Sequence, residues 1–194
     1  MIADIRPSPI AGTWYSADPT RLARQVDAYL QAAVLPSLEG EVVGLISPHA
    51  GHRYSGRTAG YAFRAVQGQH FDLVAVISPL HGYFPGDLLT TGHKAYSTPL
   101  GPVWVDSAAV EALDEALQQV SHVKLARIVN DSEHSLEIEL PFLQRALADE
   151  FQLLPVMVRS QSKAAARALG EALGRVLAGK RALLVASTDL SHFY

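Results

Sequence analysis

A chain of 194 residues with 48% hydrophobic and 18% charged side chains can bury a core of domain size, which excludes an intrinsically disordered protein. Its net charge of -3, without clusters of lysine or arginine, offers no electrostatic surface for nucleic acid or for an anionic membrane. No apolar stretch approaches the roughly 20 residues that span a bilayer, and the N-terminal residues lack the pattern of a secretion signal, so we expect a cytoplasmic protein with small soluble partners.

Apolar runs and helical patterns alternate along the chain. In chain order we predict helix 19–31, strand 41–47, helix 56–67, strand 72–78, helix 107–119, helix 132–149, strand 151–158, helix 162–177 and strand 181–188. The strand segments are continuously apolar, which is typical of strands covered on both faces. Short apolar pieces and turn residues between 87 and 106 indicate an excursion of short, antiparallel strands. These patterns predict a single α/β domain over 1–194, with a mixed, largely parallel central sheet flanked by helices.

Three of the predicted strands are followed directly by polar residues. His49 and His81 each follow a strand through Ser-Pro and precede a glycine, and a third strand runs into Asp189 and His192. Ligands bind beyond the carboxyl ends of strands in open α/β sheets, because loops and helix N-termini converge there. The chain has eight histidines and no cysteine, so any metal ion must be held by nitrogen and oxygen. The pattern predicts a metal or acid/base site at this edge, and the alternative is that these side chains cap helices or contact loops.

The segment that begins at Asn130 holds several titratable side chains. Asn130 lies three residues ahead of Glu133, which fits a capping box in which the Glu133 carboxylate reaches back to the helix start. Glu133 and Glu137 would then share one helix face, where like charges repel unless a cation or hydrogen bonds compensate them. We expect His134 to point at the site or to be hydrogen bonded behind a ligating histidine. Pro141 implies a kink or a helix that begins later.

The loop after His49 contains further polar residues. His52 is expected to have a supporting or solvent-facing role rather than to bind a metal ion. Arg53, Tyr54 and Ser55 either hold a substrate anion or are ordinary polar loop residues.

The remaining aromatic and histidine residues receive plainer interpretations. Trp14 and Tyr15 either line a pocket or, as we favour, pack the N-terminal segment into the core. Surface positions are predicted for three further histidines, His70, His93 and His122.

Five motifs follow one another in a recognisable order. They are Gly12-Thr-Trp-Tyr15, Pro48-His-Ala-Gly51 with Tyr54-Ser-Gly56, Ser78-Pro-Leu-His81, Glu133-His-Ser-Leu-Glu137 with Leu140-Pro-Phe142, and Ser187-Thr-Asp-Leu-Ser-His192. Together they resemble the Memo family, whose bacterial and archaeal members are often called AmmeMemoRadiSam system protein B. The family is similar in fold to the class III extradiol dioxygenases, which open catechol rings with non-haem Fe(II).

This resemblance implies that His49 and His81 are metal ligands, with Asp189, His192 and His134 as catalytic side chains in the same pocket. His192 is our choice for the group that takes a substrate proton. Two imidazoles and one anionic ligand leave open positions on a divalent ion, which we expect to be Fe(II) or, alternatively, copper. In Memo proteins the third ligand is usually a cysteine and in the dioxygenases a glutamate; the sequence identifies no third ligand in this chain.

Members of this family typically continue for several more strands and helices. We therefore expect residues 1–194 to form a Memo-like domain without its C-terminal portion. The strand at 181–188 would then present an unpaired edge, which favours association into a homo-oligomer.

Two functions of different classes follow. The first is a metal-dependent redox or dioxygenase-like activity at the histidine pocket. The second is a non-catalytic adaptor that binds a small molecule or a peptide in the same pocket. A serine hydrolase that uses His192 and Asp189 is a third interpretation, although the chain has no Gly-x-Ser-x-Gly motif to supply the nucleophile.

Overall fold

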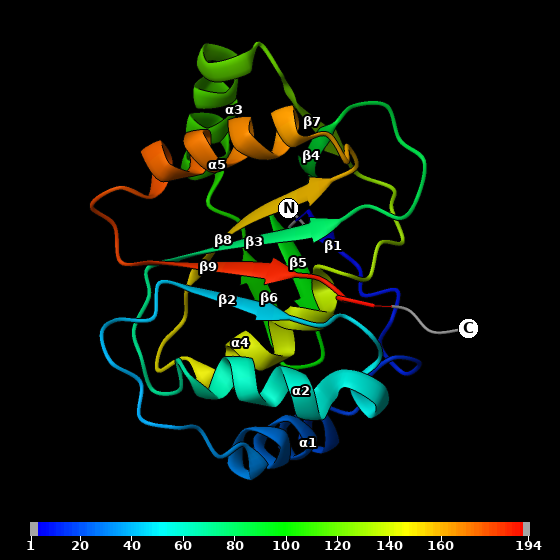
Figure 1. Ribbon diagram of the computed structural model, residues 1–194. Coiled ribbons are helices and arrows are strands. Elements are labelled where there is room, and N and C mark those ends of the chain that lie inside the picture. Colours follow the sequence, from blue (N-terminus) through cyan, green and yellow to red (C-terminus); the bar gives the residue numbers. More distant parts are fainter. Residues whose placement is uncertain (1–3, 192–194) are drawn as a thin grey trace.

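The computed structural model describes residues 4–191 and places six strands in a central sheet (Figure 1). In spatial order these are β2 (Gly44–Ser47), β9 (Ala182–Ser187), β3 (Leu73–Pro79), β8 (Gln152–Val158), β4 (Leu88–Thr91) and β7 (Leu125–Ile128). The first four run parallel; β4 is antiparallel to β8, and β7 is parallel to β4. The sheet is therefore mixed and largely parallel, as predicted.

Helices cover both faces of this sheet. The five are α1 (Pro19–Ala32), α2 (His52–Arg64), α3 (Ser107–Ser121), α4 (Leu140–Ala146) and α5 (Lys163–Leu177). In Figure 1, α3 and α5 lie on one side of the sheet, and α1, α2 and α4 lie on the other. The side chains of Asp18, Asp106 and Ser162 cap the first turns of α1, α3 and α5 by accepting backbone N–H groups.

Burial on both faces explains why the central strands are continuously apolar. In β3, Val74 and Val76 belong to the core that includes Phe63 of α2. Leu73 and Ala75, which alternate with them, belong to the core under α3 and α5. Each residue of the strand thus has an apolar environment whichever way it points.

A second, smaller sheet comprises β1 (Ile5–Arg6), β5 (Ala95–Thr98) and β6 (Gly101–Trp104). The β5–β6 pair is antiparallel, and so is the β4–β8 pair. This confirms the prediction of short antiparallel strands between 87 and 106. Two further strands, β1 and β7, were not predicted; β1 has only two residues, which is too few for a periodic pattern.

The structure corrects two predictions. Helix 132–149 is instead a loop followed by one 3-10 turn, η1 (Glu137–Glu139), and α4, in which Pro141 occupies the first turn. The helix begins later because Pro141 has no backbone N–H to donate and is tolerated in the first turn of a helix but not in its interior. The strand at 181–188 is no sheet edge, since β9 is hydrogen bonded to β2 on one side and to β3 on the other.

The strand order places the predicted site residues together. Because β2, β9 and β3 are adjacent and parallel, their carboxyl ends meet at one edge, where the loops bearing His49, His81 and Asp189 begin.

Within residues 4–191, no helix combines the length and apolar character needed to cross a membrane.

Candidate metal centre

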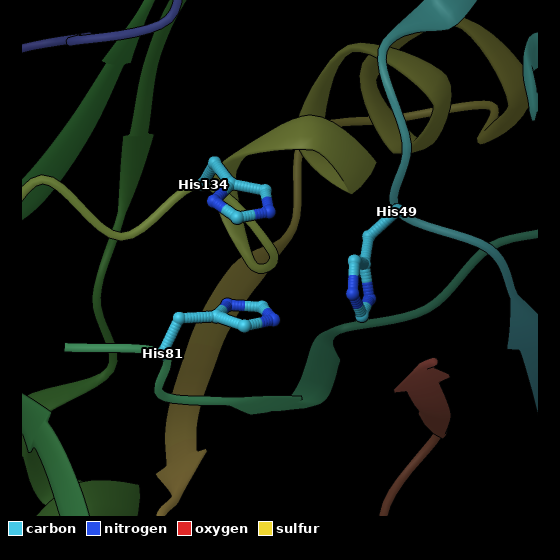
Figure 2. A group of neighbouring side chains, drawn as sticks. All are labelled: His49, His81 and His134. Atoms are coloured by element: carbon cyan, nitrogen blue, oxygen red, sulfur yellow. The ribbon is translucent and has the colours of Figure 1, made fainter. Parts of the chain in front are cut away.

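Three histidine side chains converge beyond this sheet edge. His49 follows β2, His81 follows β3, and His134 lies in the loop before η1. Each ring places a nitrogen within 4.8 Å of a nitrogen of the other two. The rings of His81 and His134 stack with centroids 4.7 Å apart, and both face His49, whose ring stands at 76° to that of His81 (Figure 2).

Hydrogen bonds behind His49 determine which ring nitrogen carries the proton. The Ser187 hydroxyl donates to the carbonyl of Ser135 at 2.6 Å. Its oxygen therefore accepts from Nδ1–H of His49, which lies 3.1 Å away. Nε2 of His49 is left with its lone pair. Burial lowers the pKa of His49 against the opposing influence of Asp189, which keeps the imidazole neutral near pH 7.

His81 is held in the same way by a carboxylate. Oε1 of Glu133 accepts from Nδ1 of His81 at 2.9 Å, and Oε2 accepts from the His81 backbone N–H at 2.6 Å. Burial opposes ionisation of Glu133, but hydrogen bonds from His81 and Ser135 lower its pKa to about 2. Because an ionised carboxylate only accepts, Nδ1 of His81 donates in this hydrogen bond, and Nε2 is the ring nitrogen left for another partner.

His134 completes the cluster on the side of Trp14. The two rings lie with centroids 4.1 Å apart, and Nδ1 of His134 is 3.3 Å from Oε1 of Glu133. Burial lowers the pKa of His134, so this imidazole, like that of His49, is neutral near pH 7. The sequence left two positions open for His134, pointing at the site or standing behind a ligating histidine. In the structure its ring points at the site.

The donor set fits a divalent transition-metal ion. Ions of this kind bind imidazole nitrogen at about 2.0–2.1 Å, which sets three such nitrogens about 3–3.5 Å apart. One nitrogen of each of the three rings lies within 4.8 Å of the others, which is close to that arrangement. Nδ1 of His49 and Nδ1 of His81 each donate to an acceptor. Metal-bound histidines usually have such a supporting hydrogen bond on the ring nitrogen that does not bind the metal. A possible three-histidine metal site is therefore present, and its donors suit iron, copper or zinc.

A cavity of about 580 Å³ opens onto the three histidines. Its other lining residues are Thr13, Trp14, Ala50, Gly51, Arg53, Tyr54 and Asp189. Oδ1 of Asp189 accepts the backbone N–H of His49 at 2.9 Å, and Oδ2 lies 3.7 Å from Nε2 of the same residue. Asp189 is thus an anionic neighbour of the cluster, as predicted. His192, the other predicted acid/base residue, lies outside the described residues.

A buried ionic network supports the loop that carries Glu133 and His134. Arg6, 2% exposed, binds Asp131 at 2.6 Å and Glu137 at 2.8 Å, and donates to the backbone carbonyl of Glu133 at 2.7 Å. Tyr15 donates to the second oxygen of Glu137 at 2.6 Å. The structure thus corrects the capping-box prediction. No helix spans this loop, so Glu133 binds His81, and Glu137 is compensated by Arg6 and Tyr15.

Glu139 is a second buried carboxyl near the site, and one of its oxygens has no hydrogen-bond partner. Burial raises its pKa to about 8, although the hydroxyl of Ser47 favours the ionised form. Glu139 is therefore largely protonated at pH 7.

The other predicted side chains divide clearly. His52 is buried, lies 3.2 Å from the Ile138 carbonyl through Nε2, and has its pKa lowered by burial to about 4, which fits the supporting role. Tyr15 is in the core, and Trp14 both packs against the core and lines the cavity, so the two interpretations hold together for Trp14. His70 and His122 are exposed as predicted, while His93 is partly buried between Asp4 and the Val129 carbonyl.

Sequence reasoning missed Ser187 and misassigned Glu133. Each of the three strands that lead to the site has a serine at its last or penultimate position, Ser47, Ser78 and Ser187, and this recurrence was a usable signal of buried polar contacts. The serine against His49 is 3% exposed and donates to a carbonyl, an arrangement that does not suit a nucleophile.

Comparisons with known proteins agree on one family. The model of the Memo-like protein family matches residues 6–194. The chain is 31% identical over 193 residues to a MEMO1 family protein of Nitrosopumilus maritimus, covering 97% of this chain and 69% of that protein. It is 33% identical over 190 residues to the memo-1 homolog of Caenorhabditis elegans, of which it covers 53%. A MEMO1 family protein of Aquifex aeolicus is 31% identical over 189 residues, with 68% of its length covered.

Proposed function

The chain belongs to the Memo-like protein family, and we propose that it binds one divalent metal ion through His49, His81 and His134 and uses it in redox chemistry on a small molecule. The observation that carries this proposal is the convergence of three imidazoles, two of which have Nδ1 committed to an acceptor. A hydrogen bond on Nδ1 restricts the rotation of the imidazole ring and directs Nε2 toward a metal ion.

Iron in the Fe(II) state is our preferred ion, with copper as the alternative. Three imidazoles leave further coordination positions open, and the resemblance to extradiol dioxygenases favours iron. When bound, the ion would supply a Lewis acid and a one-electron redox centre. His134 then takes the place of the third ligand that the sequence did not identify, and a carboxylate oxygen of Asp189 lies 3.7 Å from Nε2 of His49.

The protein's own residues orient and shield the reacting groups. Glu133 and Ser187 hold two of the rings, so neither has to reorganise when substrate enters. Trp14 lines one side of the cavity with its apolar ring, which lies against the ring of His134. We propose that Asp189, together with His192, accepts a proton from a hydroxyl group of the substrate. The carboxylate of Asp189 lies beside the cluster, where it can take that proton.

Metal analysis of purified variants tests the assignment. The wild-type protein is loaded with Fe(II) without oxygen, desalted, and its bound metal measured, and the same is done with Cu(I) and Zn(II). One ion per chain is expected for wild type, and a large loss for His49→Ala, His81→Ala and His134→Ala. His70→Ala, a change at an exposed histidine, is the matched control and should retain the ion. Equal stoichiometry in all five proteins would refute the ligand assignment.

The adaptor function is the second candidate, favoured by the open cavity and by Tyr54, which is 81% exposed at its wall. Oxygen uptake on a panel of catechols separates the two. Uptake that requires the three histidines supports redox chemistry. Ligand binding that survives their replacement, with no oxygen uptake by wild type, supports the adaptor.

A further inference from the structure

The outer wall of the cavity carries a second set of polar and aromatic groups beyond the histidines. It is built by the segment before α1, with Trp14, and by the start of α2, with Arg53 and Tyr54. A volume of about 580 Å³ is in the usual range of small-molecule sites and much larger than a metal ion needs. The wall therefore has the size to select a ligand.

Arg53 is the cationic side chain of this wall. Among the cavity's lining residues it is the one arginine, and no lysine joins it. Within residues 4–191 the Arg53 side chain has no hydrogen bond and no ion pair, whereas every other lining charge is engaged: Asp189 accepts from the His49 backbone. The nearby Glu133 carboxylate is directed at His81. A guanidinium left without a carboxylate beside a cavity is a ready partner for an anionic group, which it binds through two parallel hydrogen bonds.

Trp14 supplies a flat apolar surface beside the same space. Its ring lies at 38° to that of His134, with centroids 4.1 Å apart, so the two rings form a continuous wall. The indole N–H of Trp14 makes no hydrogen bond within the part of the chain that the structure describes. Aromatic ligands gain from contact with such surfaces through stacking and apolar burial.

We propose that the cavity binds a small aromatic carboxylate, with its ring against Trp14 and its carboxylate on Arg53. The proposal rests on the proposed function in one respect, that the ligand's other end lies at His49, His81 and His134. Arg53 is then the residue that selects anionic over neutral aromatic ligands.

Binding of salicylate and of phenol, its neutral counterpart without the carboxylate, tests this inference. The chain has two tryptophans, so a Trp104→Phe background leaves Trp14 as the fluorescent reporter inside the cavity. Titrations are made with metal-free and with metal-loaded protein. Salicylate is expected to bind at least tenfold more tightly than phenol, and Arg53→Gln is expected to remove that preference without changing phenol binding or metal stoichiometry.

Arg57→Gln is the matched control, since Arg57 is exposed one turn later on α2 and does not line the cavity. It should leave both affinities as in wild type. Equal affinity for salicylate and phenol in the wild type, or an equal loss in both arginine variants, would overturn the inference. The outcome is separable from that of the metal proposal: His81→Ala abolishes metal binding, yet the Arg53-dependent preference for salicylate should persist in the metal-free protein.

Discussion

Both oxygens of Glu133 bind the single residue His81, one through the imidazole Nδ1 at 2.9 Å and one through the backbone N–H at 2.6 Å. One carboxylate thus fixes the loop after β3 and the ring orientation together. The same Oε1 also accepts the backbone N–H groups of His134 and Ser135. Glu133 therefore joins the two loops that carry two of the three candidate ligands.

Replacing Glu133 by glutamine should weaken metal binding. The amide leaves one acceptor where the carboxylate had two and turns N–H donors toward the donors of His81 and Ser135. Loss of such a supporting group typically costs 10–100-fold in metal affinity, and we expect a decrease of that order in a competition titration with a chelator. Glu111→Gln, at an exposed partner of Arg127, is the control. An unchanged affinity in Glu133→Gln would contradict the positioning role.

Arg6→Met should destabilise the fold strongly. The side chain is buried between Asp131 and Glu137, and its removal leaves two buried carboxylates without their cation. Breaking such a pair costs roughly 3–5 kcal/mol, which should appear as a lower midpoint in urea denaturation. Arg127→Met, which breaks an exposed pair, should change the midpoint far less. Similar midpoints for the two variants would show that the buried network contributes little.

The stability of the protein should depend on pH through Glu139. Its pKa is about 8 in the folded state against about 4.5 in the unfolded state. Below pH 4.5 both states hold the proton and the stabilisation is complete; between pH 4.5 and 8 only the folded state holds it, so the free energy of unfolding falls by roughly 1.4 kcal/mol per pH unit. Glu139→Gln cannot titrate, so the difference between the variant and wild type should rise with that slope. A difference that stays constant from pH 5 to pH 8 would be at odds with a protonated Glu139.

Gly60→Ala should destabilise the contact between α1 and α2. A Cβ at this position would lie 2.6 Å from the backbone carbonyl oxygen of Tyr29, which cannot move without shifting α1. Overpacking of this kind costs about 1–3 kcal/mol, measurable as a lower melting temperature. Gly170→Ala on α5 is the contrasting control, because a Cβ there meets nothing within 4 Å. It should raise the melting temperature, since alanine favours the helix.

The sequence was informative where one pattern determined the structure. Long apolar runs predicted β3, β8 and β9, and the serine and proline residues at strand ends predicted that His49, His81 and Asp189 would meet at one sheet edge. Local patterns misled where long-range contacts decide. Glu133 looks like a helix cap in sequence, yet its partner is His81, 52 residues away. The position of Arg6 against Asp131 likewise depends on a separation of 125 residues.

Anomalous-difference diffraction from Co(II)-loaded crystals shows whether His49, His81 and His134 together hold one metal ion. We expect a single strong peak about 2.0–2.2 Å from one nitrogen of each of the three rings. Co(II)-loaded crystals of the His134→Ala variant should show a weaker peak at this position or none. A peak bound to other residues, or one beyond coordination distance of His134, would mean that the three histidines do not form one metal site.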